Sequence, residues 1–521
     1  GRVFDGEGAL SAGASSRLLA DYPEPQRSQV LDYLFKPDYG ASLQVLKVEI
    51  GGDTNSTDGD EASHMRNPTD LDCNRGYEWS LMEQAKARNP AIKLYALEWG
   101  APGWVGAGQN TVWTSQNITY LLNWLGCARQ HGLQINYLGG WNEAGYNQAW
   151  YEQLRAALDA NGYQNVQVVA ADSFGWGVAD SMASDPAFNS AVNDVSVHYP
   201  CGYLGGYTSC PSTSTAQGLG KPLWAGEQGS QPYDSGAIPL ARALNREYLD
   251  GQMTSTINWS LVWSGYAGLP FGGDGLMLAN TPWSGNYTVG PSIWAMAHTA
   301  QFTQPGWRYL DSASTYLTGG GSEVTLRSPT SGDWSSVIET TTATSPQELT
   351  YRISGGLSPG TVHVWATDMN SGKPANWFQH VSDITPQQGS FSLNLQPGYL
   401  YTLTTTTGQQ KGSASSSGAA SSLRLPYSED FNSYQPEVTP TYFAGLGGAF
   451  EAEPCIAGLP PAGPATSGMC LQQQITSQPV TWWGVDNKPM VVAGDPSWRD
   501  YRASIDALMP RPGGYVELVG R

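Results

Sequence analysis

Eight short apolar runs alternate with helical patterns through the first 265 residues, and this alternation limits the fold more than any other feature. The strand-like runs are Val3–Ser11, Leu43–Gly51, Ile92–Trp99, Ile135–Trp141, Val166–Ala171, Asp194–His198, Pro222–Gly226 and Thr254–Trp263. Apolar residues spaced by three and four predict helices at Gln26–Phe35, Tyr77–Arg88, Ile118–His131, Trp150–Ala160 and Ile238–Asp250. Runs that are apolar throughout are typical of parallel strands buried on both faces. We therefore predict a (β/α)8 TIM barrel over residues 1–301.

Two glutamates follow strands of this predicted barrel. The fourth run ends in Trp141-Asn142-Glu143, and the seventh continues into Glu227. Barrel enzymes place their catalytic residues at the strand ends, and a closed barrel lets strands four and seven face each other. Retaining glycosidases use two carboxyl groups about 5–5.5 Å apart. We predict that Glu143 is the acid/base, that Glu227 is the nucleophile and that Asn142 binds the sugar 2-hydroxyl.

Other polar and aromatic residues near the strand ends have simpler interpretations. Glu98 ends the third run, but a single carboxylate there is usually a surface or salt-bridge residue. His198 is either a contact of the sugar or nucleophile or a structural histidine, and Trp99 and Trp259 are either pocket walls or barrel core. Because Asp favours turns, three residues are expected to be turn or cap residues: Asp53, Asp58 and Asp172.

The composition favours a neutral ligand. Only 14% of the residues are charged, against roughly 25% in typical chains. The net charge of −19 disfavours nucleic acid and anionic membranes as partners. Trp (20) and Tyr (27) outnumber Phe (11), which suits sugar faces as well as protein cores. Six histidines without ligand spacing argue against a catalytic metal or other cofactor.

Cysteine usage favours a secreted or lysosomal protein. Cys201 and Cys210 bracket one loop, and Cys455 and Cys470 bracket another, so each pair is predicted to form a local disulfide. The chain starts without a signal-peptide pattern and is expected to be mature or cytosolic, and no apolar run is long enough for a membrane span. N-glycosylation sequons occur at Asn55, Asn117, Asn258 and Asn286. Asn258 lies in a predicted barrel strand and is expected to be a chance match.

The pattern changes after residue 301. Short alternating runs separated by turn residues predict a β-sandwich over 302–407, with strands at Glu323–Leu326, Ser336–Thr341, Glu348–Ile353, Thr361–Trp365, Phe391–Leu395 and Tyr399–Thr404. Residues Gly408–Ser422, mostly Gly, Ser and Ala, predict a flexible linker. Residues 423–521, with Trp482-Trp483, predict another β domain. Its run Tyr515–Val519 is expected to be a strand without its partner, as in a domain that is incomplete here.

The motifs of the chain resemble, in their order, those of the galactosylceramidase (galactocerebrosidase) family, glycoside hydrolase family 59, a family of retaining β-galactosidases. The stretches that carry the resemblance include Phe4-Asp5-Gly6, Tyr22-Pro23-Glu24-Pro25, Lys47–Asp53, Ser63-His64-Met65, Arg75-Gly76-Tyr77-Glu78-Trp79, Pro102-Gly103-Trp104, Trp141-Asn142-Glu143, His198-Tyr199-Pro200, Pro282-Trp283-Ser284-Gly285 and His298–Trp307. The likeness weakens across the sandwich and returns at Asp430-Phe431-Asn432 and Thr481-Trp482.

The resemblance implies an exo-β-galactosidase with Glu143 as acid/base and Glu227 as nucleophile. It further implies a lectin-like domain at 423–521, with Trp482 reaching the site mouth, and it is compatible with a structural calcium ion in that domain. A glycolipid substrate would imply a lipid-presenting partner protein. The residues that the resemblance assigns to galactose binding are Thr57, Trp99, Asn142, His198, Ser230 and Trp259.

Three departures from the family pattern concern the substrate. Phe271 stands where the family has Tyr, Glu98 stands where Pro is expected and adds a carboxylate near the site, and no Arg occurs around Asn376-Trp377. These departures do not decide the aglycone, which is either ceramide or another group. One alternative is a β-galactosidase acting on soluble or plant-derived galactosides. The other, from a different class, is a non-catalytic carbohydrate-binding protein.

Overall fold

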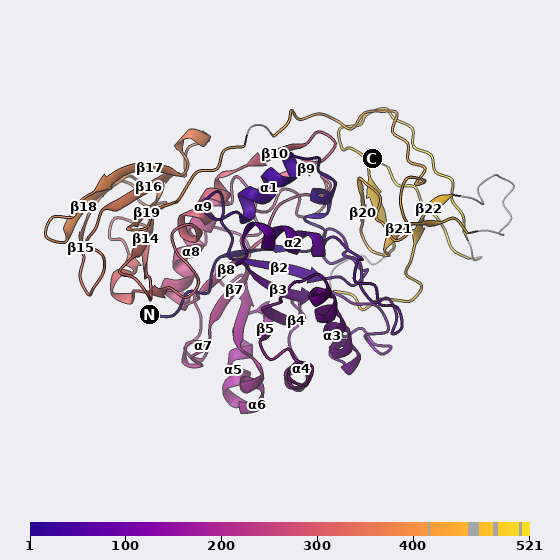
Figure 1. Ribbon diagram of the computed structural model, residues 1–521, viewed down its shortest axis with the longest axis horizontal. Helices are drawn as coiled ribbons and strands as arrows, with labels where there is room; N and C mark the ends of the chain where they lie inside the picture. The colour runs from indigo at the N-terminus through magenta and orange to yellow at the C-terminus, as the bar shows by residue number, and fades with distance from the viewer. Residues whose placement is uncertain (415–416, 457–467, 483–487, 510–512, 521) are drawn as a thin grey trace.

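A closed barrel of eight parallel strands forms the centre of the molecule (Figure 1). The computed structural model describes residues 1–414, 417–456, 468–482, 488–509 and 513–520. The strands pair in chain order, and β8 closes the barrel against β1. Their bounds are β1 Gly8–Ser11, β2 Val45–Ile50, β3 Lys93–Glu98, β4 Tyr137–Trp141, β5 Gln167–Phe174, β6 Asp194–His198, β7 Leu223–Gln228 and β8 Ser255–Trp259. The predicted TIM barrel is confirmed.

Helices cover the outside of the barrel between successive strands. Polar caps fix where several begin: the Thr114 side chain accepts from the Asn117 backbone before α3, and Asn147 accepts from Trp150 before α4. The helices are α1 Gln26–Phe35, α2 Glu78–Arg88, α3 Ser115–Gln130, α4 Gln148–Ala160, α5 Gly177–Ser184, α6 Pro186–Ala191, α7 Ser214–Gly218, α8 Ala237–Gly251 and α9 Pro291–Ala300. The described residues also form the 3-10 segments η1 Arg17–Asp21, η2 Asp311–Ala313 and η3 Pro374–Asn376. No helix of the described residues is long and apolar enough to cross a membrane.

Strand alternation separates two cores in the barrel. Along β3, Leu94 and Ala96 pack with the surrounding helices. Tyr95 and Leu97, together with Trp99 directly after the strand, join an inner cluster with residues of other strands. The inner cluster is largely aromatic, and its members include Tyr137, Trp224 and Trp259. A chain rich in Trp and Tyr therefore lines the barrel interior with flat rings.

Antiparallel strands follow the barrel, as predicted. The strands after β8 are β9 Met277–Thr281, β10 Asn286–Val289, β11 Arg308–Tyr309, β12 Thr315–Tyr316, β13 Ser322–Arg327, β14 Trp334–Glu339, β15 Gln347–Arg352, β16 Val362–Asp368, β17 Gln379–Ile384, β18 Ser390–Leu395 and β19 Tyr399–Thr404. A sheet containing β13, β14, β19, β16 and β17 and a β15–β18 pair enclose one apolar core between them. This is the predicted sandwich, extended by the unpredicted strand β17.

Two small antiparallel sheets form the C-terminal part: β20 Phe443–Gly445 with β23 Val491–Ala493, and β21 Phe450–Pro454 with β22 Met469–Gln473. The prediction of a strand at Tyr515–Val519 is wrong, because this run has no regular structure and Val519 is 76% exposed. Trp483 lies outside the described residues. The lectin-like character of this part, the domain boundaries and a structural calcium ion stay predictions.

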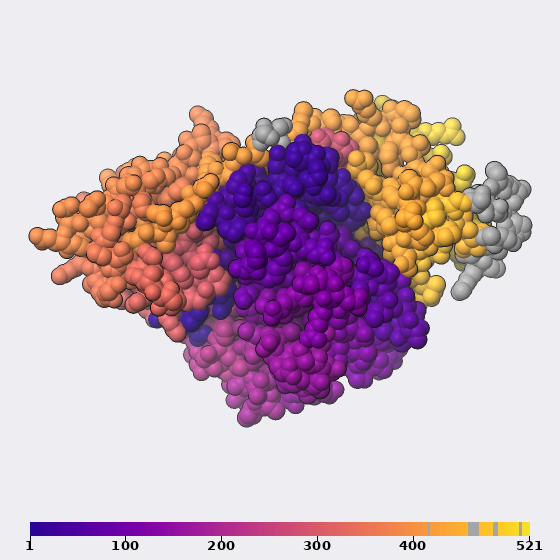
Figure 2. Space-filling view, in the orientation of Figure 1, coloured from indigo at the N-terminus to yellow at the C-terminus, as the bar shows by residue number. Residues whose placement is uncertain are grey.

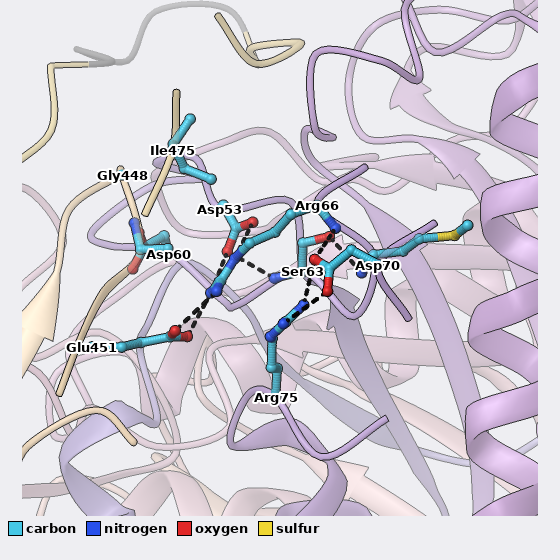
Figure 3. A network of polar contacts seen from close by, with 12 residues as sticks. Asp53, Asp60, Ser63, Arg66, Asp70, Arg75, Gly448, Glu451 and Ile475 are labelled. Carbon is cyan, nitrogen blue, oxygen red and sulfur yellow. Dashed lines mark hydrogen bonds and ion pairs between the residues drawn. The ribbon is translucent and has the colours of Figure 1, made fainter. Parts of the chain in front are cut away.

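An arginine network joins the C-terminal part to the barrel (Figure 3). Arg66, in the loop after β2, donates to Asp53 at 3.2 Å and to Glu451 of β21 at 2.9 Å. Arg75 pairs with Asp70 at 2.8 Å and with Glu437 at 2.9 Å. Asp53, expected to be a turn or cap residue, lies in a bend and is also a fully buried partner of Arg66. Figure 2 shows the sandwich and the C-terminal part on opposite sides of the barrel.

The described residues of the segment 408–422 lie between these two parts, along the barrel. They form neither helix nor strand, and several bond to the barrel. That the segment is a flexible linker stays a prediction. The Gly412 backbone donates to Tyr39 at 2.7 Å, and Trp283 donates to Ser421 at 2.8 Å. The segment is therefore attached to the barrel at more than one point.

Three disulfides are formed. Cys201–Cys210 and Cys455–Cys470 are the two predicted local pairs. Cys73–Cys127 joins the loop after β2 to α3 across 54 residues and was not anticipated.

Candidate active site

The ends of β4, β5 and β6 carry residues with left-handed backbone. Glu143, Asp172 and Tyr199 have φ of 51°, 51° and 52°. Backbone bonds hold them in place, since Glu143 donates to the Asp172 carbonyl and Tyr199 to the Glu227 carbonyl, both at 2.8 Å. The β5–β6 and β6–β7 pairings shift register at this level. Such irregularities change the direction of side chains next to active sites, and here they occur where the predicted catalytic residues lie.

His198 lies between the two predicted catalytic glutamates. Its Nδ1 atom is 3.0 Å from Glu143 Oε1 and 3.5 Å from Glu227 Oε2. One ligand atom from each of the three side chains lies within 4.8 Å of the others. The carboxylates thus approach each other at about the separation that retaining glycosidases use. Both glutamate side chains are 7% exposed, so the pair is open to a small ligand while largely shielded from water.

A buried charged group lies beneath this trio. Lys47 of β2 donates to Asp172 Oδ1 at 2.9 Å and to the Gly226 carbonyl at 3.0 Å. Tyr95 also donates to Asp172, as does Ser196 at 2.8 Å. The expectation that Asp172 caps a turn is wrong: the residue lies in β5, is fully buried and comes within 3.5 Å of His198 Nε2.

These contacts set the protonation of the site. Burial alone would lower the pKa of His198, but Glu227, Asp172 and Glu143 outweigh it and raise the pKa to about 9. Burial likewise opposes ionisation of Asp172, yet Lys47 and His198 hold its pKa well below the usual range. Burial raises the pKa of Glu227 despite the opposing charge of His198. A cationic histidine therefore faces the two glutamates at neutral and acidic pH.

Tyr199 is a site residue that the strand-end argument missed. Its hydroxyl donates to Glu227 Oε1 and lies 2.9 Å from the Ser230 hydroxyl. Ser230, assigned to the site by resemblance, therefore reaches Glu227 through Tyr199. The available signal was the motif His198-Tyr199-Pro200, which places a phenol directly after the end of β6.

The aromatic residues predicted at the site gather in and around the inner barrel cluster. Trp99 and Trp259 belong to the inner barrel cluster, and Phe271 and Trp482 pack against it. Phe271 meets Trp259 edge-on at 5.1 Å between ring centroids. The Trp482 indole donates to the Asn142 carbonyl at 2.9 Å, which places the C-terminal part at the barrel mouth.

Asn142 and Thr57 lie next to these walls. Asn142 is 1% exposed, and its amide Oδ1 has no hydrogen-bond partner within the described residues. Thr57 packs over Gly13, and the neighbouring Asp58 accepts from the Phe271 backbone at 3.2 Å. Asp58, expected in a turn, therefore supports the loop that carries Phe271. Of the predicted residues, the structure brings Trp482 to Asn142 and Phe271 to Trp259, and it brings His198 to the two glutamates.

Glu98 adds no carboxylate to this mouth. Its side chain points away from the barrel interior and accepts from Asn117 of α3 at 2.6 Å. Burial raises the pKa of Glu98 to about 8, so the carboxyl is protonated at neutral pH. Asn117 is 0% exposed and Asn258 is 2% exposed, so neither sequon is accessible to a glycan in the folded protein.

Glu143, His198 and Glu227 also offer three atoms that could bind a metal ion. A metal ligand must be deprotonated at the binding nitrogen. The raised pKa of His198 opposes this at acidic and neutral pH, so the trio is better suited to proton transfer than to metal binding.

The comparisons with known proteins show the family of the chain. Residues 4–301 match the model of glycosyl hydrolase family 59, and residues 309–410 match its central domain. Galactocerebrosidase of Danio rerio is 40% identical over 99% of this chain and 79% of its own length. Galactocerebrosidase of Homo sapiens is 38% identical over 100% of this chain and 77% of its own length.

Solved structures share the fold at low identity. The catalytic domain of GH30 xylanase C from Talaromyces cellulolyticus has a TM-score of 0.61 at 18% identity, covering 78% of this chain and 98% of that one. SrfJ from Salmonella typhimurium has a TM-score of 0.59 at 17% identity, and the match covers 78% of this chain and 91% of that one. The family model and the relatives decide the assignment: the chain is a glycoside hydrolase and belongs to glycosyl hydrolase family 59.

Proposed function

We propose that the protein is a retaining exo-β-galactosidase of galactosylceramidase type, with Glu143 as acid/base and Glu227 as nucleophile. The observation that supports this most is the convergence of the two carboxylates on His198, within 4.8 Å. An inverting enzyme needs about 6.5–9.5 Å between its carboxyl groups to admit a water molecule. The pair is too close for that geometry.

In the first step, Glu227 attacks the anomeric carbon while Glu143 gives its proton to the leaving oxygen. The bond from the anomeric carbon to the aglycone oxygen breaks, and an ester to Glu227 forms. The Tyr199 hydroxyl donates to Glu227 Oε1. This hydrogen bond orients the carboxylate, so that its other oxygen is the one that attacks the anomeric carbon. The unpaired Asn142 Oδ1 accepts a hydrogen bond from the sugar 2-hydroxyl, and this hydrogen bond strengthens in the transition state.

In the second step, Glu143 takes a proton from water, and the resulting hydroxide displaces Glu227 from the anomeric carbon. The charges of the site fit this cycle. Lys47 and His198 supply two positive charges beside Asp172 and Glu227. Because a general acid must carry its proton to act, we expect the rate to peak below neutrality, and a maximum above about pH 8 would contradict the assignment.

The substrate is a terminal β-galactoside, by analogy with the galactocerebrosidases that the chain resembles. The aglycone is ceramide, presented by a lipid-carrying protein, or a non-lipid group such as that of a soluble or plant-derived galactoside. Phe271 contributes an apolar ring without a hydroxyl beside Trp259, and assays on both kinds of galactoside decide between the two aglycones. Three disulfides suit a secreted or lysosomal location.

One experiment separates the mechanisms. The protein is incubated with an aryl β-galactoside, and the anomer released first is identified by proton NMR. Release of β-galactose supports retention, and α-galactose would refute it. A 2-fluoro galactoside should label Glu227, and Glu227→Gln should lose at least 1,000-fold in kcat, on the order of other nucleophile deletions.

The controls address substrate and folding. Glu98→Gln, which alters a carboxyl bonded to α3 and away from the mouth, should retain activity near that of the parent. Parallel assays on galactosylceramide and the aryl galactoside decide the aglycone. If Glu227→Gln cleaved the aryl galactoside at the parental rate, the nucleophile would lie elsewhere. If neither substrate were cleaved by the folded parent, the carbohydrate-binding alternative would be favoured.

A further inference from the structure

Two of the six histidines of the chain lie together on the sandwich, far along the chain from the catalytic residues. His363 lies on β16, and His380 and Asp383 lie on β17, the strand that the sequence pattern did not reveal. Of the other four histidines, His198 belongs to the active site, His131 pairs with Glu83, and the remaining two are buried. The β16–β17 pair therefore holds a separate group of nitrogen and oxygen donors.

A bulge brings the three side chains to one face. His363 is paired with Asp383, but the register shifts between Val364 and Trp365, so that His380 is paired with Trp365. Without the extra residue, His380 would point to the opposite face, because successive side chains alternate across a strand. Bulges of this kind commonly redirect a side chain toward a functional position.

The opposite face of β16 is fixed by packing. Val362, Val364 and Ala366 are buried in the sandwich core, so His363 and Trp365 face outward from it. The Trp365 ring lies 5.3 Å from the His380 ring and limits its movement. The three donors thus stand on two paired strands, which hold a site more firmly than loops do.

The three donor atoms converge on one point. His363 Nδ1 and His380 Nε2 both lie 2.7 Å from Asp383 Oδ1, and all three atoms are within 4.8 Å of one another. Ligands of a tetrahedral zinc ion, bound at about 2.0–2.2 Å, stand about 3.4 Å apart. Small side-chain rotations would open the two 2.7 Å pairs to that spacing.

We propose that His363, His380 and Asp383 form a binding site for a divalent transition-metal ion, with zinc as the first candidate. Two imidazoles and one carboxylate suit zinc, nickel or copper better than magnesium or calcium. The side chains are 21%, 42% and 52% exposed, so water completes the coordination sphere and the ion enters from solvent. Binding displaces the protons that the two imidazole nitrogens share with Asp383.

A titration of the metal-free full chain with zinc chloride at pH 7.5, followed by calorimetry, tests the site. We expect His363→Gln and Asp383→Asn to bind zinc at least tenfold more weakly than the parent. Glu83→Gln is the matched control, because it removes an exposed carboxylate that contacts only one histidine, His131. Glu227→Gln controls for zinc at the catalytic trio. Both control variants should bind zinc at the sandwich site as tightly as the parent does.

Two further readouts separate metal binding from simple folding effects. Zinc should raise the melting temperature of the parent and not that of Asp383→Asn, and binding at pH 5 should fall at least tenfold because the imidazoles protonate. The proposal is overturned if the sandwich variants bind zinc as tightly as the parent. It is equally overturned if only Glu227→Gln loses zinc, or if the parent binds none of zinc, nickel and copper.

Discussion

At the scale of single residues, His198 connects the two halves of the site. Its Nδ1 faces both glutamates, and its Nε2 faces Asp172, which in turn binds Lys47. A charge inside a barrel is costly unless it is paired. The network therefore pairs its own buried charges, and it also fixes the positions of Glu143 and Glu227.

Tyr199→Phe should lower kcat/KM by about 10- to 100-fold, because a hydrogen bond to a charged group contributes about 1.5–3 kcal/mol. The lost bond is the one from the Tyr199 hydroxyl to Glu227. Steady-state kinetics on an aryl β-galactoside measures the effect. Tyr203→Phe is the control, since this ring lies 4.9 Å from Tyr199 and is 43% exposed. Equal losses in the two variants would contradict a specific role for Tyr199.

Lys47→Met should destabilise the protein by about 3 kcal/mol or more, because it leaves Asp172 buried without its main counter-charge. Urea unfolding followed by tryptophan fluorescence measures the change. Lys373→Met, at an exposed position, should differ from the parent by less than about 0.5 kcal/mol. A Lys47 variant as stable as the Lys373 variant would show that the ion pair is dispensable.

At the scale of elements, the disulfide Cys73–Cys127 has the larger expected effect on stability. It closes 54 residues, against 9 for Cys201–Cys210. Chain-entropy estimates give about 4 and about 2.5 kcal/mol for such loops. The paired Cys→Ser variants should rank in this order in urea unfolding. The reverse order would indicate that the loop after β2 is already held by its other contacts, such as those of Arg66 and Arg75.

The barrel strands and the two glutamates could be predicted because both depend on local patterns. A strand buried on both faces is apolar throughout, and a strand end shows where a carboxylate enters the mouth. Glu143 and Glu227 therefore follow from the sequence together with barrel closure. Their roles in catalysis stay predictions that the experiments above test.

Other features could not be predicted because they arise only when distant segments meet. Lys47 and Asp172 are 125 residues apart, and neither has a local pattern that indicates a buried ion pair. β17 is an exposed strand with few apolar residues, so it lacks the alternation that marks a strand. Tyr515–Val519 has that alternation, but a strand also needs a neighbour to bond. Cys73 lies in the loop after β2 and Cys127 lies in α3, so no local spacing indicates that they form a disulfide.

At the scale of the whole molecule, buried acids should make the fold more stable in mild acid. Burial raises the pKa values of Glu7, Glu49 and Glu98 to about 8 from a usual 4.5. Between these values the folded protein binds more protons than the unfolded chain, so stability falls as the pH rises toward 8. His64 and His298 act in the opposite direction below pH 6.5. Both are buried, with pKa values of about 3, so the unfolded chain binds more protons there and stability falls as the pH falls.

The melting temperature should therefore be higher at pH 6 than at pH 8. Differential scanning calorimetry at both values measures it. Glu98→Gln cannot titrate and should show a smaller difference between the two pH values, while Glu348→Gln, on an exposed strand position, should match the parent. A melting temperature that rises from pH 6 to pH 8 would contradict this account.

Trp482 has a consequence for how the enzyme is made. Its indole bonds to Asn142 across 340 residues of sequence, so this contact can form only long after the two glutamates have been translated. A ribosome that has just finished the barrel holds a nascent chain in which Glu143 and Glu227 are present and the Trp482 indole is not. A ribosome that stalls before residue 482 therefore releases a barrel that lacks this aromatic contact at its mouth.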